Sequence, residues 1–273
     1  MKKKHFVVVG TDRRLAAAAR TLSEAGMTVS FYERNDGVIR GADALLLPLP
    51  MTRDGIHVSN TENTVRIADI LASAPQETAI FAGKTDGFSD ARLIDYAKND
   101  FFERMNALPT AEGTLAIVLA ETEITVCGMR VGITGFGRVA RAVAYLFHAV
   151  GADVTVFARR EEVCAEAERM GYHAPGLAAL DASAGDLDVL INTVPHRIVT
   201  AEVISRMEKD ALIVDLASMP GGVDFDFARD TEICAIHALA LPGKYSPKTA
   251  GAIVGETVLS LLSNETYRGD DRS

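Results

Sequence analysis

A glycine-rich turn near the middle of the chain constrains the fold more than any other feature. The apolar run 131–134 has the length of a buried strand, and residues 138–150 beyond the turn have the composition of a helix. Gly135, Gly137 and Ala140 fit the spacing G-x-G-x-x-G/A. The first glycine permits a sharp turn, the second lets a diphosphate approach the backbone, and the small third residue lets the helix lie close to the strand. The sequence therefore predicts a dinucleotide-binding strand–turn–helix unit here.

The expected dinucleotide contacts lie in this turn and the first helical residues. Free N–H groups and the positive end of the helix dipole favour phosphate there. The predicted contacts are Gly135, Phe136, Gly137, Arg138 and Val139.

The next predicted strand, 153–157, indicates which dinucleotide is bound. An acidic residue at its end would accept from the 2′-hydroxyl of NAD, but this chain has Ala158, Arg159 and Arg160. Guanidinium groups cannot accept from a hydroxyl and suit a 2′-phosphate. We therefore predict NADP(H) as cofactor, with Arg159 and Arg160 as ligands. The alternative is that both arginines are solvated residues at a helix start.

Composition argues against several partners and sites. The 273 residues carry a formal net charge of −9, and such a surface repels nucleic acid. No run approaches the roughly 18 apolar residues of a membrane-spanning helix. The apolar run 6–9 is too short for an export signal and predicts a first strand. Cys127, Cys164 and Cys234 form no C-x-x-C pair, which favours a reducing cytoplasm and no metal site.

Strands alternate with helical stretches along the whole chain, which predicts an α/β protein. We expect two doubly wound, Rossmann-like parallel-sheet domains with a cleft between them that binds the ligands. The expected strands are 6–9, 28–32, 44–47, 79–82, 131–134, 153–157, 189–193 and 211–215. Expected helices besides 138–150 are 13–25, 64–73, 90–98, 110–121 and 249–263.

The expected domains follow from this pattern. A substrate domain spans 1–108, a connector with the helix 110–121 spans 109–125, and the NADP-binding domain spans 126–248. The last helix, 249–263, is expected to join the first domain, and 264–273 to form a frayed tail.

Two loops at predicted strand ends supply candidate contacts near the nicotinamide. Thr193, Val194 and Pro195 are expected to pass beside it, and so is the backbone around Ala217 in the loop that follows Asp215. Asp215 itself has the alternative role of a helix cap or a structural hydrogen-bonding group.

Proton transfer and substrate binding have candidates on several loops. His196 is a candidate acid or base, because an imidazole can move a proton at neutral pH, with a surface histidine at a helix start as the alternative. Glu112 is a candidate proton acceptor, or only a favourable charge on a helix start. Lys248 is an anion ligand or a solvated cation, and is also a candidate at the catalytic centre. The expected substrate contacts are Thr110, Arg197, Ser218, Lys248 and Thr249. His237 is interpreted as a satisfied core residue.

Taken together, these loops are more specific than the fingerprint. Over nearly its whole length the chain resembles the dehydrogenase (A-type) subunits of dipicolinate synthases, and more broadly the 2-hydroxyacid and alanine dehydrogenases. The motifs that carry the resemblance are the segments 109–114, 135–138, 191–195, 215–218, 220–225, 241–243 and 247–251. The family pattern has a basic residue where this chain has Met219, which leaves the substrate carboxylates to Lys248, Arg197 or another group.

The resemblance implies an NADP-linked oxidation of dihydrodipicolinate, derived from 4-hydroxy-tetrahydrodipicolinate of the lysine pathway, to dipicolinate. It implies that the partner is a flavoprotein-like B subunit of dipicolinate synthase. It also implies a possible homodimer and a place in the cytoplasm of the mother cell of a sporulating bacterium. Two alternatives remain open at this point: another NAD(P)-dependent dehydrogenase of the 2-hydroxyacid type, and an NADP-binding module without turnover.

Overall fold

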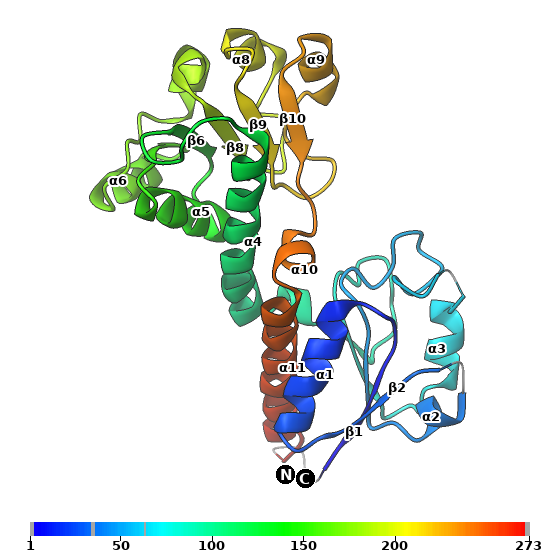
Figure 1. Cartoon of the computed structure of the whole chain (residues 1–273). Helices are drawn as coiled ribbons and strands as arrows, with labels where there is room; N and C mark the ends of the chain where they lie inside the picture. The colour runs from blue at the N-terminus through cyan, green and yellow to red at the C-terminus, as the bar shows by residue number, and fades with distance from the viewer. Residues whose placement is uncertain (1–2, 34–35, 63, 271–273) are drawn as a thin grey trace. The chain divides into compact units, whose positions relative to one another are not determined.

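The computed structural model describes residues 3–33, 36–62 and 64–270, and the chain divides into two compact units (Figure 1). Unit 1 comprises the chain up to Asn106 and again from Ser246, and unit 2 comprises Ala107–Tyr245. Each unit contains one five-stranded parallel sheet with helices on its faces. The predicted fold class, two doubly wound parallel sheets, is confirmed.

Unit 1 has the strand order β2-β1-β3-β4-β5. Its strands are β1 (His5–Val8), β2 (Thr28–Phe31), β3 (Ala44–Leu46), β4 (Ala79–Ala82) and β5 (Leu93–Asp95). Its helices are α1 (Arg13–Glu24), α2 (Asp36–Arg40), α3 (Ile67–Ser73) and α11 (Pro247–Asp270). Side chains of β1 alternate between two cores, because Phe6 packs with residues of α1 and α11 whereas Val7 packs with residues of α3.

Unit 2 has the strand order β10-β9-β8-β6-β7. Its strands are β6 (Arg130–Thr134), β7 (Asp153–Phe157), β8 (Val189–Asn192), β9 (Leu212–Asp215) and β10 (Cys234–His237). Its helices are α5 (Arg138–Ala149), α6 (Glu161–Arg169), α7 (Leu180–Ser183), α8 (Ala201–Arg206), α9 (Phe225–Asp230), α10 (Leu241–Tyr245) and most of α4 (Asp100–Glu121). The strand order reverses between β6 and β8, and in open α/β sheets ligands bind at such a switch point.

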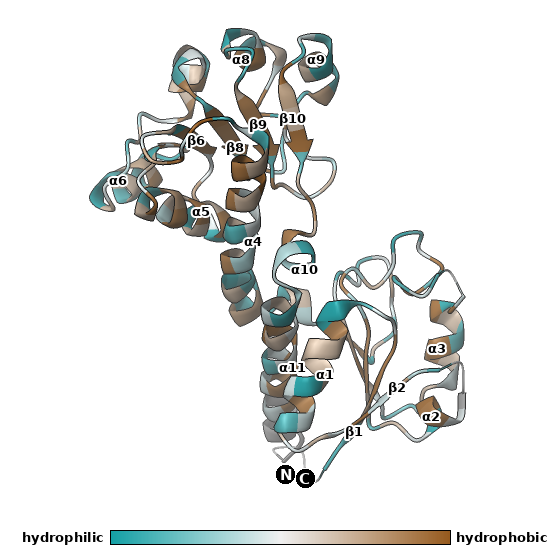
Figure 2. Cartoon of the chain, viewed as in Figure 1, coloured by the Kyte–Doolittle hydropathy of each residue, from teal (hydrophilic) through white to brown (hydrophobic). Residues whose placement is uncertain are grey.

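Apolar periodicity explains why these elements form and pack. In α5 the buried residues Ala140, Val143, Ala144 and Phe147 recur at helical spacing and cover one face of the sheet. The inner strands β3, β8 and β9 are buried along their whole length, and Figure 2 colours β8 and β9 as apolar, as expected for a parallel sheet covered by helices on each side. The edge strands β2, β5 and β10 are partly exposed.

The predicted start of the connector helix is wrong. We expected the helix to begin at Pro109–Thr110, whereas α4 begins at Asp100 and carries Pro109 inside it. An interior proline costs about 3 kcal/mol because one backbone hydrogen bond is lost. Buried apolar side chains on both sides of it, such as Phe102 and Ala111, pack into the cores and offset this cost.

Two further segments differ from the prediction. The helix expected over 90–98 is instead β5 followed by a 3₁₀ turn at Tyr96–Lys98, because pairing with β4 overrides local propensity. The last helix continues to Asp270 through most of the expected tail, since polar residues alone do not end a helix; residues 271–273 lie outside the described chain. Among the described helices, none has both the length and the apolar content to span a bilayer.

Candidate functional site

The glycine-rich turn joins β6 to α5 at the switch point of the unit 2 sheet. Gly135 has a φ of +80°, which favours glycine, and its N–H donates to the carbonyl of Phe157 at 2.9 Å. Gly137 is the N-cap of α5 and offers no side chain to cap it. A Cβ added to Gly137 would meet no protein atom within 4 Å, so open space lies where the helix presents its first N–H groups.

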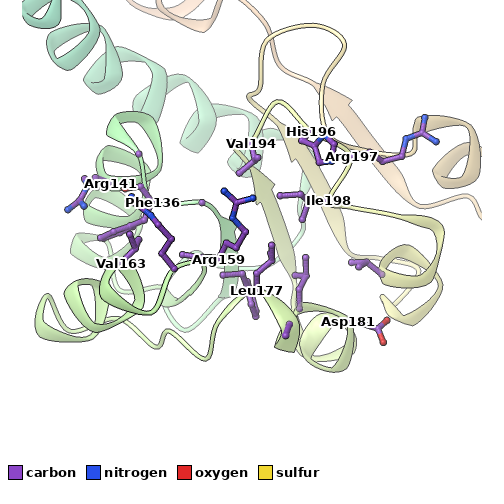
Figure 3. A pocket seen from close by; sticks show the side chains of 18 of the residues that line it. Phe136, Arg141, Arg159, Val163, Leu177, Asp181, Val194, His196, Arg197 and Ile198 are labelled. Atoms are coloured by element: carbon purple, nitrogen blue, oxygen red, sulfur yellow. Dashed lines mark hydrogen bonds between the residues drawn. The ribbon is translucent and has the colours of Figure 1, made fainter.

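A cavity of about 750 Å³ lies over this turn (Figure 3). Eight of the residues that line it belong to the site predicted from the sequence: Gly135, Phe136, Gly137, Arg159, Arg160, Val194, His196 and Arg197. The sequence did not predict the rest of the lining: Arg141, Phe157, Ala158, Val163, Glu166, Leu177, Ala178, Leu180, Asp181, Ile198 and Val203. Its mostly apolar wall with a few charged groups is typical of a small-molecule or cofactor site.

Arg159 and Arg160 follow the end of β7 and are both exposed. Within the described part of the chain neither side chain forms a hydrogen bond or ion pair. Figure 3 shows Arg159 projecting into the cavity. Two guanidinium groups without a carboxylate partner on a cavity wall have the chemistry to bind an anion.

Arg141 closes one wall of the cavity. Its guanidinium donates two hydrogen bonds to Glu166, at 2.6 and 2.7 Å, and a third to the carbonyl of Phe136 at 3.0 Å. It also lies over the Phe136 ring, 4.3 Å from the centroid. The hydrogen bonds from Arg141 lower the pKa of Glu166, and those to Glu166 raise the pKa of Arg141. This charged pair therefore fixes the Phe136 segment of the turn.

A buried polar network lies where β6, β8 and β9 end. The Asn192 side chain accepts from the Thr134 hydroxyl at 2.5 Å and donates to Asp215 at 2.7 Å. All three side chains are fully buried. Asp215 also accepts from the N–H groups of Ala217 and Gly222, at 3.0 and 2.7 Å. The structural role considered for Asp215 is thereby confirmed.

The loop after β8 brings several predicted residues to the cavity. Val194 and His196 line it, and the Thr193 hydroxyl donates to the carbonyl of Thr134 at 2.8 Å. His196 lies before α8 rather than at its start, because that helix begins at Ala201. The Arg197 guanidinium pairs with Asp224 at 3.3 Å, so a substrate carboxylate there would compete with Asp224.

Other predicted contacts in unit 2 lie outside the cavity wall. They are Arg138 and Val139 in the first turn of α5, Thr193, Pro195, Ala217 and Ser218. Ala217 is buried and its carbonyl accepts from the His237 ring at 2.9 Å. This histidine has the expected hydrogen-bond partner, but it is half-buried and is not a core residue. Met219 is 69% exposed.

Thr110 and Glu112 lie inside α4, because this helix begins at Asp100. The alternative role of Glu112, a favourable charge on a helix start, is therefore wrong. The Thr110 carbonyl accepts from the Thr114 hydroxyl at 2.9 Å as part of the helix.

Lys248 and Thr249 belong to unit 1, in the first turn of α11, and both are exposed. Lys248 lines a groove of about 440 Å³ with Arg13, Arg20 and Glu24 of α1, and Glu24 accepts a hydrogen bond from Arg20 at 2.8 Å. Because Glu24 offsets the charge of Arg20, Lys248 and Arg13 are the cations of this groove that favour an anionic ligand. Within the described residues, no group of three or more His, Cys, Asp or Glu side chains could hold a metal ion.

Comparisons with known proteins agree with this architecture. Residues 117–219 match the family of the D-isomer specific 2-hydroxyacid dehydrogenase NAD-binding domain. The chain is 32% identical to the A subunit of dipicolinate synthase from Bacillus subtilis, covering 94% of this chain and 95% of the relative. It is also similar to two crystal structures. That of the dipicolinate synthase A subunit from Bacillus halodurans has a TM-score of 0.86, with 31% identity over 95% of this chain and 97% of the other. That of the corresponding Bacillus subtilis polypeptide has a TM-score of 0.87, with 29% identity over 98% of each.

Proposed function

The chain belongs to the family of dipicolinate synthase A subunits, and from this membership we propose that it is the dehydrogenase subunit of a dipicolinate synthase. Its nucleotide-binding domain is of the dehydrogenase type, so the cofactor is a nicotinamide dinucleotide. The observation that carries the proposal is the cavity at the switch point, in which the glycine-rich turn and the strand loops of a dehydrogenase meet.

NADP(H) is the proposed cofactor, and the residues present fit it. Open space at Gly137 and the uncapped start of α5 suit a diphosphate. Arg159 and Arg160 suit the 2′-phosphate, because no acidic residue occupies the strand end to accept from a ribose hydroxyl. Leu177, Ala178 and Val203 offer an apolar wall for the adenine. When bound, the oxidised cofactor supplies a hydride acceptor at C4 of its ring.

Dihydrodipicolinate is the proposed substrate. A dihydropyridine becomes an aromatic pyridine when it loses one hydride and one proton, so the chain mainly has to orient the substrate and take up the proton. We propose His196 as the proton acceptor, because it lines the cavity and imidazole titrates near neutral pH. Glu112 is the second candidate for this role.

A dianionic substrate needs cationic partners. We propose Lys248 as one carboxylate ligand, supported by the cation Arg13 on the same groove. Thr249, Ser218, Thr110 and Arg197 are proposed as further contacts, with Arg197 released from Asp224 when it binds substrate.

The proposed partners and place in the cell follow from the family. We propose that a flavoprotein-like B subunit is the partner and that the protein itself forms a homodimer. The proposed location is the cytoplasm of a sporulating mother cell.

The test is an absorbance assay at the reduced-nicotinamide band with enzymatically generated dihydrodipicolinate, with and without a B subunit. Formation of NADPH together with dipicolinate supports the proposal. Turnover of simple 2-hydroxy or 2-keto acids instead would assign a 2-hydroxyacid dehydrogenase, for which the family match of residues 117–219 is the supporting observation. Tight NADPH binding without turnover, even with the B subunit present, would assign a binding module.

A further inference from the structure

Four adjacent strands of the unit 2 sheet each end in a polar residue, and these residues lie side by side in a row across the sheet. Thr134, Asn192, Asp215 and His237 are register partners across β6, β8, β9 and β10. The first three are fully buried, although a buried polar group is costly unless its hydrogen bonds are satisfied. Such a row at the carboxyl edge of a parallel sheet lies directly under the loops that face the ligand.

The amide of Asn192 is saturated with hydrogen bonds. Its Oδ1 accepts from the Thr134 hydroxyl at 2.5 Å and from the Val194 N–H at 3.2 Å. Its Nδ2 donates to the Val194 carbonyl at 3.0 Å and to Asp215 Oδ1 at 2.7 Å. A backbone N–H can only donate and a carbonyl can only accept, so only one orientation of the amide fits both groups of Val194.

Asp215 extends this connection to the next loop. Its carboxylate accepts from the N–H groups of Ala217 and Gly222, which bracket the loop after β9. A Cβ at Gly222 would lie 2.5 Å from the Val194 carbonyl oxygen and 2.6 Å from that of His196. The two loops are therefore in direct backbone contact. Asn192 is hydrogen-bonded to one of them directly, at Val194, and to the other through Asp215.

The glycine-rich turn is part of the same arrangement. A Cβ at Gly135 would lie 2.9 Å from Val194 Cγ2 and 3.0 Å from Thr193 Oγ1. The glycine-rich turn, the loop after β8 and the loop after β9 thus meet at Val194. The backbone N–H and C=O of Val194 are both hydrogen-bonded to the Asn192 side chain.

We propose that Asn192 is a positioning residue for hydride transfer: it sets the Val194 wall of the cavity relative to the glycine-rich turn and the loop 216–222. The inference rests on the proposed function, since it assumes that the nicotinamide lies against this wall. A displacement of reacting groups by about 1 Å can lower a rate by about 100-fold. The diphosphate and 2′-phosphate contacts proposed for Gly137, Arg159 and Arg160 do not involve Asn192, so cofactor affinity depends on it little.

The test compares Asn192→Ser with the wild-type protein, both assayed with the B subunit. We expect kcat to fall about 10- to 100-fold, the Kd for NADPH to stay within about threefold, and the emission of bound NADPH to shift toward that of the free cofactor. Thr78→Val is the matched control, because it also removes a buried side-chain hydrogen bond, here to the Ala42 carbonyl at 3.0 Å in unit 1. It should leave all three values unchanged.

A kcat for folded Asn192→Ser within about twofold of wild type would overturn the inference, and so would parallel losses of kcat and NADPH affinity, which indicate a general structural role. If Asn192→Ser does not fold, Thr134→Val decides, since it removes one of the four bonds of the amide. It should lower kcat about 2- to 5-fold with NADPH affinity retained, and an unchanged kcat would count against the inference. Wild-type protein that binds no NADPH would overturn the proposed function itself.

Discussion

Gly135 lies so close to Val194 that a Cβ at position 135 would sit 2.9 Å from Val194 Cγ2. A Cβ at Gly137, two residues later, would meet no protein atom within 4 Å. The two glycines of this motif therefore have different roles. Gly135, with its φ of +80°, is required by the fold of the turn, whereas Gly137 keeps space free for a ligand.

This difference predicts opposite effects of substitution. Gly137→Val should leave the urea unfolding midpoint almost unchanged and raise the Kd for NADPH by at least about 100-fold, because the new side chain fills the proposed diphosphate site. Gly135→Ala should lower the free energy of unfolding by about 1–3 kcal/mol, because alanine is strained at this φ and meets Val194. Urea titrations and fluorescence titrations with NADPH measure both. Retained NADPH binding by Gly137→Val would refute the assignment of the site.

The choice between NADP and NAD should depend on Arg159. Arg159→Asp replaces a proposed 2′-phosphate ligand by an acceptor for a ribose hydroxyl, so the ratio of the Kd for NADH to that for NADPH should fall at least about tenfold. Arg169→Asp makes the same charge change on an exposed part of α6 away from the cavity wall and serves as the control. If both variants keep the wild-type ratio, Arg159 is not a phosphate ligand.

Substrate binding should depend on Lys248 without affecting the cofactor. Lys248→Ala removes one cation of the α1–α11 groove, which Arg13 and the Arg20–Glu24 ion pair also line. The KM for dihydrodipicolinate should therefore rise about 10- to 100-fold while the Kd for NADPH stays constant. Lys209→Ala, at an exposed position of unit 2 in an ion pair with Glu232, is the control. Equal changes in KM and Kd would exclude Lys248 as a specific substrate ligand.

The ion pair of Arg130 with Asp188 should make stability depend on pH. Hydrogen bonds from the Arg130 side chain lower the pKa of Asp188, with contacts at 2.6 and 3.2 Å and a further one from the Arg130 backbone N–H at 2.7 Å. A depressed carboxyl pKa stabilises the fold above the unfolded value of about 3.9, and this contribution is lost as pH falls through the folded value.

Asp188→Asn should therefore lower the free energy of unfolding at pH 7 by about 0.5–1 kcal/mol, a modest value because the pair is partly exposed. The difference from wild type should shrink as the pH falls below about 4. Urea midpoints at several pH values measure it. A difference that stays constant down to acid pH would show that the charge of Asp188 is not the cause.

Local patterns in the sequence identified the glycine-rich turn and the strands β1–β4 and β6–β9, because buried apolar runs and a tight turn leave a clear signature. The edge strands β5 and β10 were not predicted, since they are only partly buried. The predicted strand 153–157 coincides with β7, and the predicted strand 131–134 differs from β6 by one residue. Helix ends were less predictable, since packing around Pro109 and pairing of β5 with β4 depend on residues far away in the chain.

The candidate site was predictable only in part for the same reason. Gly137 and Arg159 could be placed because they follow strands directly. The Asn192–Asp215 pair could not be placed. The two residues are 23 positions apart in the chain and meet only through the register between β8 and β9. A polar residue at the end of each of three apolar strands, Thr134, Asn192 and Asp215, was the available signal. Leu177 and Asp181 reach the cavity from a segment without a recognisable motif.

A crystal structure of the protein with NADPH tests the central claim most directly. The account predicts the diphosphate at Gly135 and Gly137 against the start of α5, with the 2′-phosphate within hydrogen-bonding distance of Arg159 or Arg160. A cavity that stays empty at saturating NADPH, or a 2′-phosphate directed away from both arginines, would contradict it.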